Sequence, residues 1–246
     1  MRGKELPPSS PFAGDDGSTP PALGAALAQV ADERSPAALA AVVEALADAR
    51  VLVPVLAQLD AEGRTVDGFT IDKEASAGIV ALEGPDGRTV LPVFSSTASM
   101  ARWDPAARPV PSTAVRAALS AVQEGWELLV VDPGGPVTVV VPRTATWALA
   151  RQEAWRPAVV EVDGAAQVDP AVQSSVRFSL AGIAEVRSVD AVPGERAEVA
   201  LRLAIDAGLD RAGLDAVLAR VNAALARDAV VAARVDSLEL RVRAQA

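Results

Sequence analysis

The stretch Thr89–Asp104, TVLPVFSSTASMARWD, decides how the first half of the chain is arranged. Its run Val90–Phe94 is apolar on both alternating faces, which predicts a strand inside a sheet that is covered on both sides. Ser95 and Ser96 then lead from this strand into a short helical turn that carries Trp103. A buried strand that passes directly into a helix is typical of an α/β fold.

Four further segments of strand character flank this stretch. They are residues 51–59, 78–82, 126–131 and 137–141. Residues 84–87 (GPDG) predict the turn of a hairpin that ends in the opening strand, because proline presets φ and glycine supplies positive φ. Residues 132–136 (DPGGP) predict the turn of a second hairpin for the same reason. We therefore expect a mixed sheet in the first half of the chain.

Pairs of a capping residue and a proline predict where the first two helices begin. Thr19 precedes Pro20, and Ser35 precedes Pro36. The first helix has an apolar stripe, which consists of Leu23, Leu27 and Val30.

A third helix is expected after a loop that contains Pro109 and Pro111. Ser112 is its expected cap. Its expected inner face consists of Val115, Ala118, Leu119 and Val122.

The pattern restarts around residues 154–157, where we expect a domain boundary. The elements that follow have the order β-α-β-β-α-β, which matches the ferredoxin-like plan. In one strand, Val199, Leu201, Leu203 and Ile205 alternate with residues such as Arg202. We expect an extended arm at 1–20, an α/β (α+β) mixed-sheet domain at 21–153 and a smaller ferredoxin-like domain at 157–246.

The composition excludes several classes of enzyme. The chain of 246 residues has no cysteine, histidine or tyrosine and only two lysines, Lys4 and Lys73. Ser-His-Asp triads, Cys-His pairs and Cys/His zinc sites are therefore excluded, and we expect neither a bound metal nor a cofactor. The net charge of −9 disfavours binding to nucleic acid. No apolar run approaches the length of a membrane span and no apolar leader begins the chain, so the expected location is cytoplasmic.

Four features in a fixed order resemble the SseB (enhanced serine sensitivity protein B) family. They are PFAGDDG (11–17), LVPVL (52–56), LPVFSS (91–96) with Trp103 after it, and DPGGP (132–136). The chain looks like an actinobacterial-type member with an SseB N-terminal domain over most of residues 11–157. Its second half is similar to the family's second domain only in the order of elements. The resemblance implies no catalytic residues, because the molecular activity of the family is not established.

Two acidic positions are candidate binding residues. Asp15 and Asp16 offer oxygen ligands to a hard cation, but the following residues lack the acids of a calcium loop, so an Asx-type turn or a capping arm is favoured. Asp132 begins a glycine-rich segment that has backbone N–H groups for an anion. The Lys-Ser or Lys-Thr of a phosphate-binding loop is absent after it, which favours a structural turn.

Ser95 lies at a strand-to-helix junction, which is the position of the nucleophile in α/β hydrolases. The G-x-S-x-G motif is missing, so only an arrangement with Lys73 would activate this serine, and helix capping by Ser95 or Ser96 is favoured. Trp103 and Trp155 are candidate contacts for a ligand or a partner. Packing at the edge of the core is the favoured role of both rings.

These observations favour a non-catalytic cytoplasmic protein that binds another protein or acts as a regulatory module. The alternative is a sensor of small molecules, with amino acids as the ligands suggested by the family resemblance. A metal- or serine-dependent hydrolase is the least favoured hypothesis. The sequence leaves the oligomeric state open.

Overall fold

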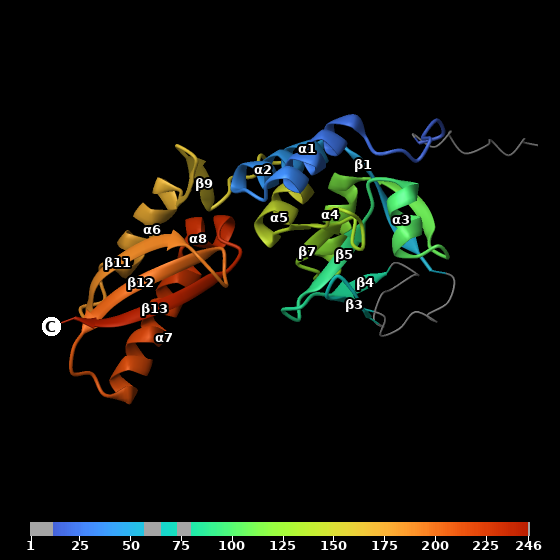
Figure 1. Ribbon diagram of the computed structural model, residues 1–246. Coiled ribbons are helices and arrows are strands. Elements are labelled where there is room, and N and C mark those ends of the chain that lie inside the picture. The colour runs from blue at the N-terminus through green and yellow to red at the C-terminus, as the bar shows by residue number, and fades with distance from the viewer. Residues whose placement is uncertain (1–11, 57–64, 73–79, 246) are drawn as a thin grey trace, which may run out of the picture.

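The computed structural model describes residues 12–56, 65–72 and 80–245 (Figure 1). The buried apolar residues of these ranges form three clusters. Two of them lie before residue 157 and share one sheet, and the third consists of residues from Ala158 to Val235. The α/β fold class is confirmed by the helices and mixed sheets of both halves, while the limits expected for the two domains stay a prediction. No helix within the described ranges has the length and apolar character needed to cross a membrane.

The first half contains a six-stranded mixed sheet. In spatial order its strands are β2 (Thr65–Val66), β3 (Phe69–Asp72), β4 (Ala81–Glu83), β5 (Thr89–Val93), β7 (Leu128–Val131) and β8 (Val139–Val141). β5 and β7 are parallel, and the other neighbours in this sheet are antiparallel. Both expected hairpins are present, and Val90–Val93 and all of β7 are buried as their sequences predict.

Successive residues of β5 and β7 point to opposite faces of this sheet. Leu91 and Leu129 pack against four helices, which are α1 (Pro21–Asp32), α2 (Pro36–Ala47), α4 (Ala114–Gln123) and α5 (Arg143–Arg151). Val90 and Val130 face the other way and pack with Met100 of the short helix α3 (Thr97–Trp103). The strands of the opening stretch therefore lie between two layers (Figure 1).

The prediction of a loop at Pro109 and Pro111 is wrong. These residues belong to β6 (Arg108–Thr113), which pairs antiparallel with β1 (Arg50–Val55). Leu52 lies opposite Pro111 and exchanges hydrogen bonds with Phe94 instead, at 2.8 Å in each direction. Proline is tolerated here because it occupies pairs of the ladder that need no N–H donor.

Two helix caps also differ from expectation. Pro20 occupies the N-cap of α1, and the hydroxyl of Thr19 instead lies 3.2 Å from that of Ser95. Thr113 rather than Ser112 caps α4, since its Oγ1 accepts from the backbone N–H of Arg116. By contrast, the Ser35 cap of α2 is confirmed.

The inner face of α4 is rotated from the one expected. Its buried residues are Ala114, Ala117, Ala118 and Ala121, whereas Leu119 is exposed. The alanine face lies against α5 and α2 as well as the sheet, and small side chains let helices approach closely. The periodicity identified the helix, but the larger side chains of Val115 and Leu119 did not mark its buried side.

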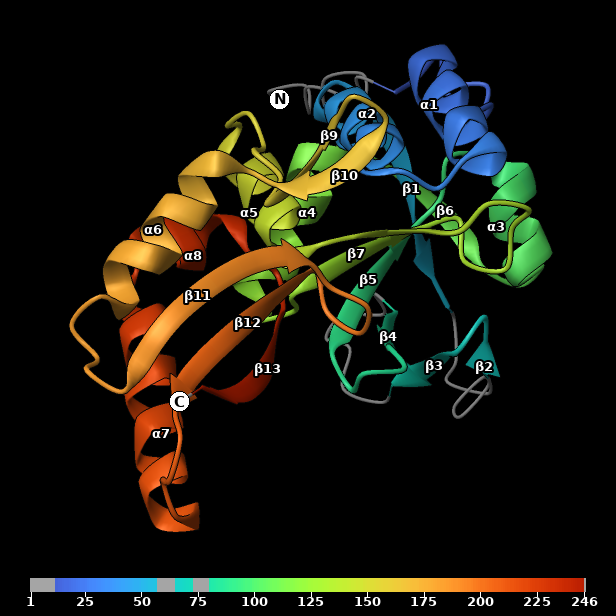
Figure 2. The ribbon, with the colours of Figure 1, turned by 60° about the vertical axis from the view of Figure 1, so that its left-hand side comes forward.

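The second half contains a three-stranded sheet with the order β11 (Val186–Pro193), β12 (Val199–Asp206) and β13 (Leu238–Gln245) (Figure 2). The expected alternation in β12 is confirmed, because Val199, Leu201, Leu203 and Ile205 are buried and Arg202 is exposed. The buried side contacts three helices, which are α6 (Pro170–Leu180), α7 (Arg211–Arg227) and α8 (Ala229–Arg234).

The ferredoxin-like detail is not confirmed. The expected first strand is a hairpin of β9 (Val159–Val162) and β10 (Ala165–Val168), whose strands pair with each other in a separate two-stranded sheet. β12 and β13 are instead direct parallel neighbours. A ferredoxin-like sheet would include the first strand, so the order of elements alone did not determine the strand order.

Candidate functional site

The parallel strands β5 and β7 end at the same edge of the sheet, the usual position of sites in open α/β sheets. Ser95 follows β5 and Asp132 follows β7. The backbone N–H of Ser95 donates to Asp132 Oδ1 at 2.8 Å, and Ser95 Oγ donates to Asp132 Oδ2 at 2.6 Å. Two residues singled out from the sequence therefore form one hydrogen-bonded pair.

The residues before α1 contact this pair, since the hydroxyl of Thr19 lies 3.2 Å from that of Ser95. Arg50 donates from Nη1 to the carbonyl oxygen of Ser95 at 2.8 Å, and its Nε lies 2.8 Å from Asp15 Oδ2. Asp15 Oδ1 also accepts from the backbone N–H of Gly17 at 3.0 Å. Asp15 is thus linked to Ser95 and Asp132 through Arg50. Its carboxylate fixes the segment before α1 against Arg50.

Asp16 is not part of this network. It is exposed, and its Oδ1 accepts from the backbone N–H of Ser18 at 2.8 Å in an Asx turn. Hydrogen bonds from Ser18 lower the pKa of the Asp16 carboxyl. No group of three or more acidic side chains able to hold a metal ion occurs within residues 12–56, 65–72 and 80–245.

Trp103 lies near the same edge of the sheet, beside Phe94. Its ring is buried and tilted by 40° against Phe94, with 5.3 Å between the ring centroids. The glycine-rich turn lies nearby, and its Gly134 N–H donates to Asp67 Oδ2 at 2.8 Å. That donor is therefore committed to the protein itself. The sequence prediction missed Asp67, although the Asp67-Gly68 pair between two short strands is a hairpin signal.

The Ser95 and Asp132 pair is sealed from solvent. Ser95 is 2% exposed and Asp132 is 4% exposed. Burial raises the pKa of Asp132, while its hydrogen bonds from Ser95 act in the opposite direction. A nucleophilic serine needs a base and access to substrate, and this arrangement gives Ser95 no access. Lys73, the other candidate activator, lies outside the described residues.

Ser96 rather than Ser95 caps α3, because its Oγ accepts from the backbone N–H of Ser99 at 3.1 Å. The expected serine cap is thus confirmed for one of the two serines. The pair at this edge acts as a structural link between β5, β7 and the segment before α1.

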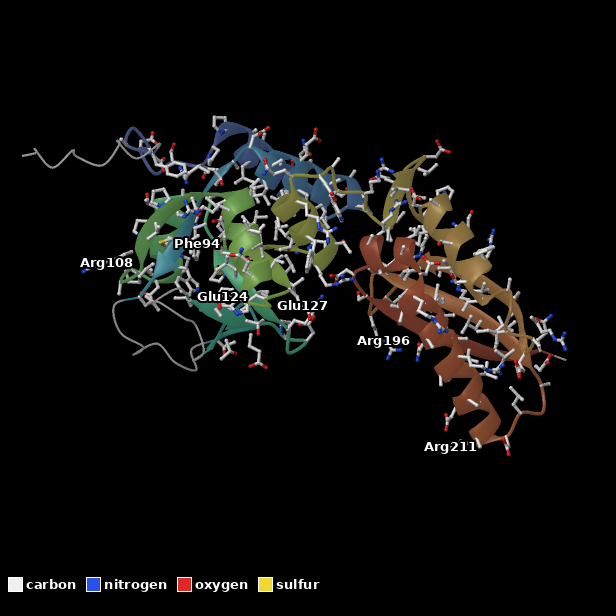
Figure 3. All side chains as sticks on the ribbon, turned by 180° about the vertical axis from the view of Figure 1, so that it is seen from behind. Phe94, Arg108, Glu124, Glu127, Arg196 and Arg211 are labelled. Atoms are coloured by element: carbon white, nitrogen blue, oxygen red, sulfur yellow. The ribbon has the colours of Figure 1, made fainter. Side chains whose placement is uncertain are left out.

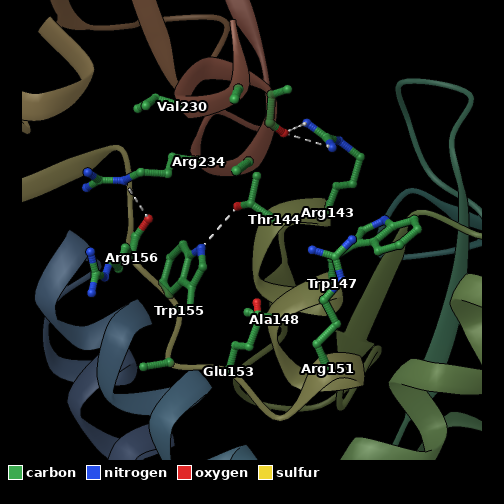
Figure 4. A pocket seen from close by; sticks show the side chains of 14 residues that line it. Arg143, Thr144, Trp147, Ala148, Arg151, Glu153, Trp155, Arg156, Val230 and Arg234 are labelled. Carbon is green, nitrogen blue, oxygen red and sulfur yellow. Dashed lines mark hydrogen bonds between the residues drawn. The ribbon is translucent and has the colours of Figure 1, made fainter. Parts of the chain in front are cut away.

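A second feature is a cavity of about 750 Å³ between the two halves (Figure 4). We call it the arginine cavity. Its lining includes Arg143, Trp147 and Arg151 of α5, Glu153 and Trp155 after α5, and Arg234 of α8. Arg143, Trp147 and Arg151 are four residues apart and form one stripe of α5. The sequence prediction missed this stripe, whose regular spacing was its signal.

Hydrogen bonds fix the walls of this cavity. Trp155 Nε1 donates to Thr144 Oγ1 at 3.0 Å, which holds its indole ring against α5. Arg143 donates from Nη2 to the carbonyl oxygen of Val235 at 2.9 Å, at the end of α8. Arg234 donates to the carbonyl oxygen of Pro157 at 2.8 Å and pairs with Asp169 at 2.9 Å. Trp155, the other tryptophan considered from the sequence, therefore lies at the junction of the two halves.

Comparison with known proteins identifies the first half of the chain. The family model described as SseB protein N-terminal domain matches residues 23–148, which include β5, β7, α2, α4 and most of α1 and α5. No curated protein and no solved structure matches the chain. Since the family model matches half of the sequence, the chain belongs to the SseB family.

Proposed function

We propose that this SseB-family chain acts in the cytoplasm as a binding or regulatory module for another protein and does not catalyse a reaction. The observation that carries the proposal is Phe178 of α6, whose side chain is 84% exposed. The chain has only four phenylalanines and four tryptophans. Exposed aromatic rings offer a large apolar contact area and are enriched at the centre of protein interfaces.

Phe178 lies on the side of α6 that faces away from the core. The buried residues of this helix are Val172, Val176 and Leu180, which pack against the three-stranded sheet. Phe178 therefore adds nothing to the core that its helix covers. Burying its ring against a partner would remove the cost of its hydration.

The non-catalytic part of the proposal is supported by the sealed pair of Ser95 and Asp132. The hydroxyl most suited by position to act as a nucleophile is hydrogen-bonded to a buried carboxyl group. Steady turnover of a substrate that is abolished by Ser95→Ala or Asp132→Asn would contradict this part.

Affinity capture from the native cell extract tests the protein-binding part. Wild-type protein and the variants Phe178→Ala and Leu119→Ala are compared, and Leu119 is the matched control because it is also an exposed apolar residue on a helix. We expect a partner that wild type and Leu119→Ala retain and Phe178→Ala loses. Equal retention by all three proteins would contradict the role of Phe178. The location is tested separately by fractionation of the native cells.

Sensing of amino acids is the second candidate, and the arginine cavity is the observation that bears on it. A free amino acid needs an acceptor for its ammonium group beside a donor for its carboxylate, and Glu153 is the acidic residue in the part of the lining that the structure describes. Ligand binding raises the melting temperature by mass action, so a thermal-shift series with single amino acids tests this candidate. A hydrolase has the least support, given the sealed serine.

A further inference from the structure

We infer that the arginine cavity binds a small organic anion, with an aromatic body and a carboxylate or phosphate group. This inference goes beyond the proposed binding to another protein and uses a different surface. The volume of about 750 Å³ lies within the range of small-molecule sites in proteins. The ligand class follows from the charge, the free donors and the flat walls of the cavity.

The charge of the cavity is opposite to that of the whole protein. The chain carries 32 acidic and 23 basic residues. Among the described residues, the lining contains four arginines, Arg143, Arg151, Arg156 and Arg234, and one acidic residue, Glu153. An excess of arginine in a hollow favours an anionic ligand over a zwitterion, because a zwitterion needs as many acceptors as donors.

The four arginines differ in what they already bind. Arg234 is neutralised by Asp169, and Arg156 points to the side of Trp155 opposite Trp147 (Figure 4). Arg143 donates to carbonyl oxygens at the end of α8, so its guanidinium is fixed in place. Among the described residues, no carboxylate is paired with the guanidinium of Arg143 or Arg151. The charge of Arg143 also interacts with the carboxyl group of Glu198, so of these two charges that of Arg151 is available to an anion.

Arg151 is the donor that a ligand would engage. Its guanidinium carbon lies 5.0 Å from the centroid of the Trp147 ring, and the two side chains lie side by side in Figure 4. A guanidinium stacked on an aromatic face keeps its N–H groups in the plane of the stack, where they can donate to a carboxylate or a phosphate. Unlike Arg143, Arg151 has no side-chain hydrogen bond to any residue that the structure describes.

The apolar walls indicate an aromatic body for the ligand. Trp147 is 39% exposed, so part of its apolar ring is open to a ligand. Trp155 is held against α5 by its hydrogen bond to Thr144, and Ala148 and Val230 are among the other apolar residues of the lining. A planar ring would cover these surfaces while its charged group meets Arg151.

Calorimetric titration of the full chain with four probes tests this inference. Adenosine monophosphate and benzoate combine a ring with an anion, whereas inorganic phosphate supplies the anion alone and adenosine the ring alone. We expect at least one of the first two probes to bind saturably, and to bind more tightly than phosphate and adenosine. Adenosine monophosphate carries a phosphate and benzoate a carboxylate, so the tighter of the two identifies the better combination of ring and anion.

Three variants locate the site. We expect Arg151→Glu to weaken binding roughly tenfold to a hundredfold, since a charged hydrogen bond is lost. Trp147→Ala should also weaken it. Arg211→Glu is the matched control, because it makes the same charge change at an exposed position at the start of α7, at the outer end of the molecule (Figure 3) and outside the lining of the cavity.

Four results would overturn the inference. They are the absence of saturable binding of both ring-bearing anions up to about 10 mM, which is a very weak affinity, equal binding by wild type and Arg151→Glu, equal weakening by Arg211→Glu, and binding of phosphate as tight as that of the tighter ring-bearing anion. Circular dichroism of each variant confirms that the fold is kept. Because Phe178 lies outside the cavity, loss of partner capture in Phe178→Ala would not affect this test.

Discussion

Arg88 and Asp236 are 148 residues apart in the sequence and form an ion pair between the two halves of the protein. Arg88 Nη1 donates to both carboxylate oxygens of Asp236, at 3.2 and 3.0 Å. Asp236 Oδ1 also accepts from the backbone N–H of Arg143 at 2.8 Å, and its own backbone N–H donates to Glu198 at 2.7 Å. One carboxylate thus joins the turn before β5, the start of α5 and the segment before β13.

Replacing this carboxylate is expected to destabilise the whole protein. The Asp236 side chain is 8% exposed, so Asp236→Ala should lower the free energy of unfolding by about 2–3 kcal/mol, through the loss of charged hydrogen bonds. Asp86→Asn is the matched control, because Asp86 pairs with the same Arg88 but is half exposed. We expect the control to cost less than about 1 kcal/mol. Urea unfolding measures both changes, and equal losses would contradict a special role of Asp236.

Local sequence patterns predicted the elements whose neighbours are close in the chain. The turns at 84–87 and 132–136 and the Ser35 cap depend on residues a few positions apart, and all are present. β6 was missed because its prolines are signals for a loop unless the partner strand is known. The paired residues of β1 lie 53 to 63 positions earlier, so no local pattern contains this information.

The candidate site was predictable only in part, for the same reason. The sequence singled out Ser95 and Asp132 separately, by strand ends and a turn motif, but their pairing depends on β5 and β7 being parallel neighbours. The roles of Arg50 and Asp67 follow from contacts across 35 and 67 residues. The alanine face of α4 was missed because periodicity marks large apolar residues, while close packing of helices favours small ones.

Asp132 should make stability depend on pH in a specific direction. Its folded-state pKa lies above its ordinary value of 3.8, because burial disfavours the charged form. The contribution of Asp132 to the free energy of unfolding is therefore full when the pH is below that ordinary value. It is lost as the pH rises through the folded-state pKa.

The variant Asp132→Asn isolates this effect, because asparagine does not titrate and tolerates the positive φ of this position. We expect the stability of wild type minus that of Asp132→Asn to decrease as the pH is raised from about the ordinary pKa to neutrality. Chemical denaturation over a pH series measures this difference. A difference that increases with pH would mean that hydrogen bonds from Ser95 outweigh burial.

Gly134 is expected to tolerate a side chain poorly. Its φ is +71°, and a Cβ at this position would lie 2.8 Å from Val66 Cγ1. Gly87 has a similar φ of +79° with open space around it. We expect Gly87→Ala to cost about 1–2 kcal/mol, for the left-handed backbone alone, and Gly134→Ala about 2–4 kcal/mol, because overpacking is added. Thermal unfolding of both variants measures the difference, and equal costs would show that β2 moves aside freely.

Glu239 of β13 should contribute stability that acid removes. Its carboxylate accepts from the backbone N–H of Glu195 at 2.9 Å and from Arg241 at 2.7 Å. These hydrogen bonds lower its pKa from 4.5 to about 2. Because the folded-state pKa is depressed, the contribution of Glu239 to the free energy of unfolding is full when the pH is above the ordinary value. It is lost as the pH falls toward about 2.

The variant Glu239→Gln tests this window, because glutamine keeps the shape of the side chain without its charge. We expect wild type to be more stable than Glu239→Gln at neutral pH, and the difference to shrink steadily in acid, since protonation of Glu239 removes the charged hydrogen bonds. Glu195→Gln is the control, because Glu195 is exposed and its pair with Arg241 is a surface ion pair of small effect. Urea unfolding at successive pH values measures each difference. A constant gap between wild type and Glu239→Gln down to strong acid would show that the charge of Glu239 does not stabilise the sheet.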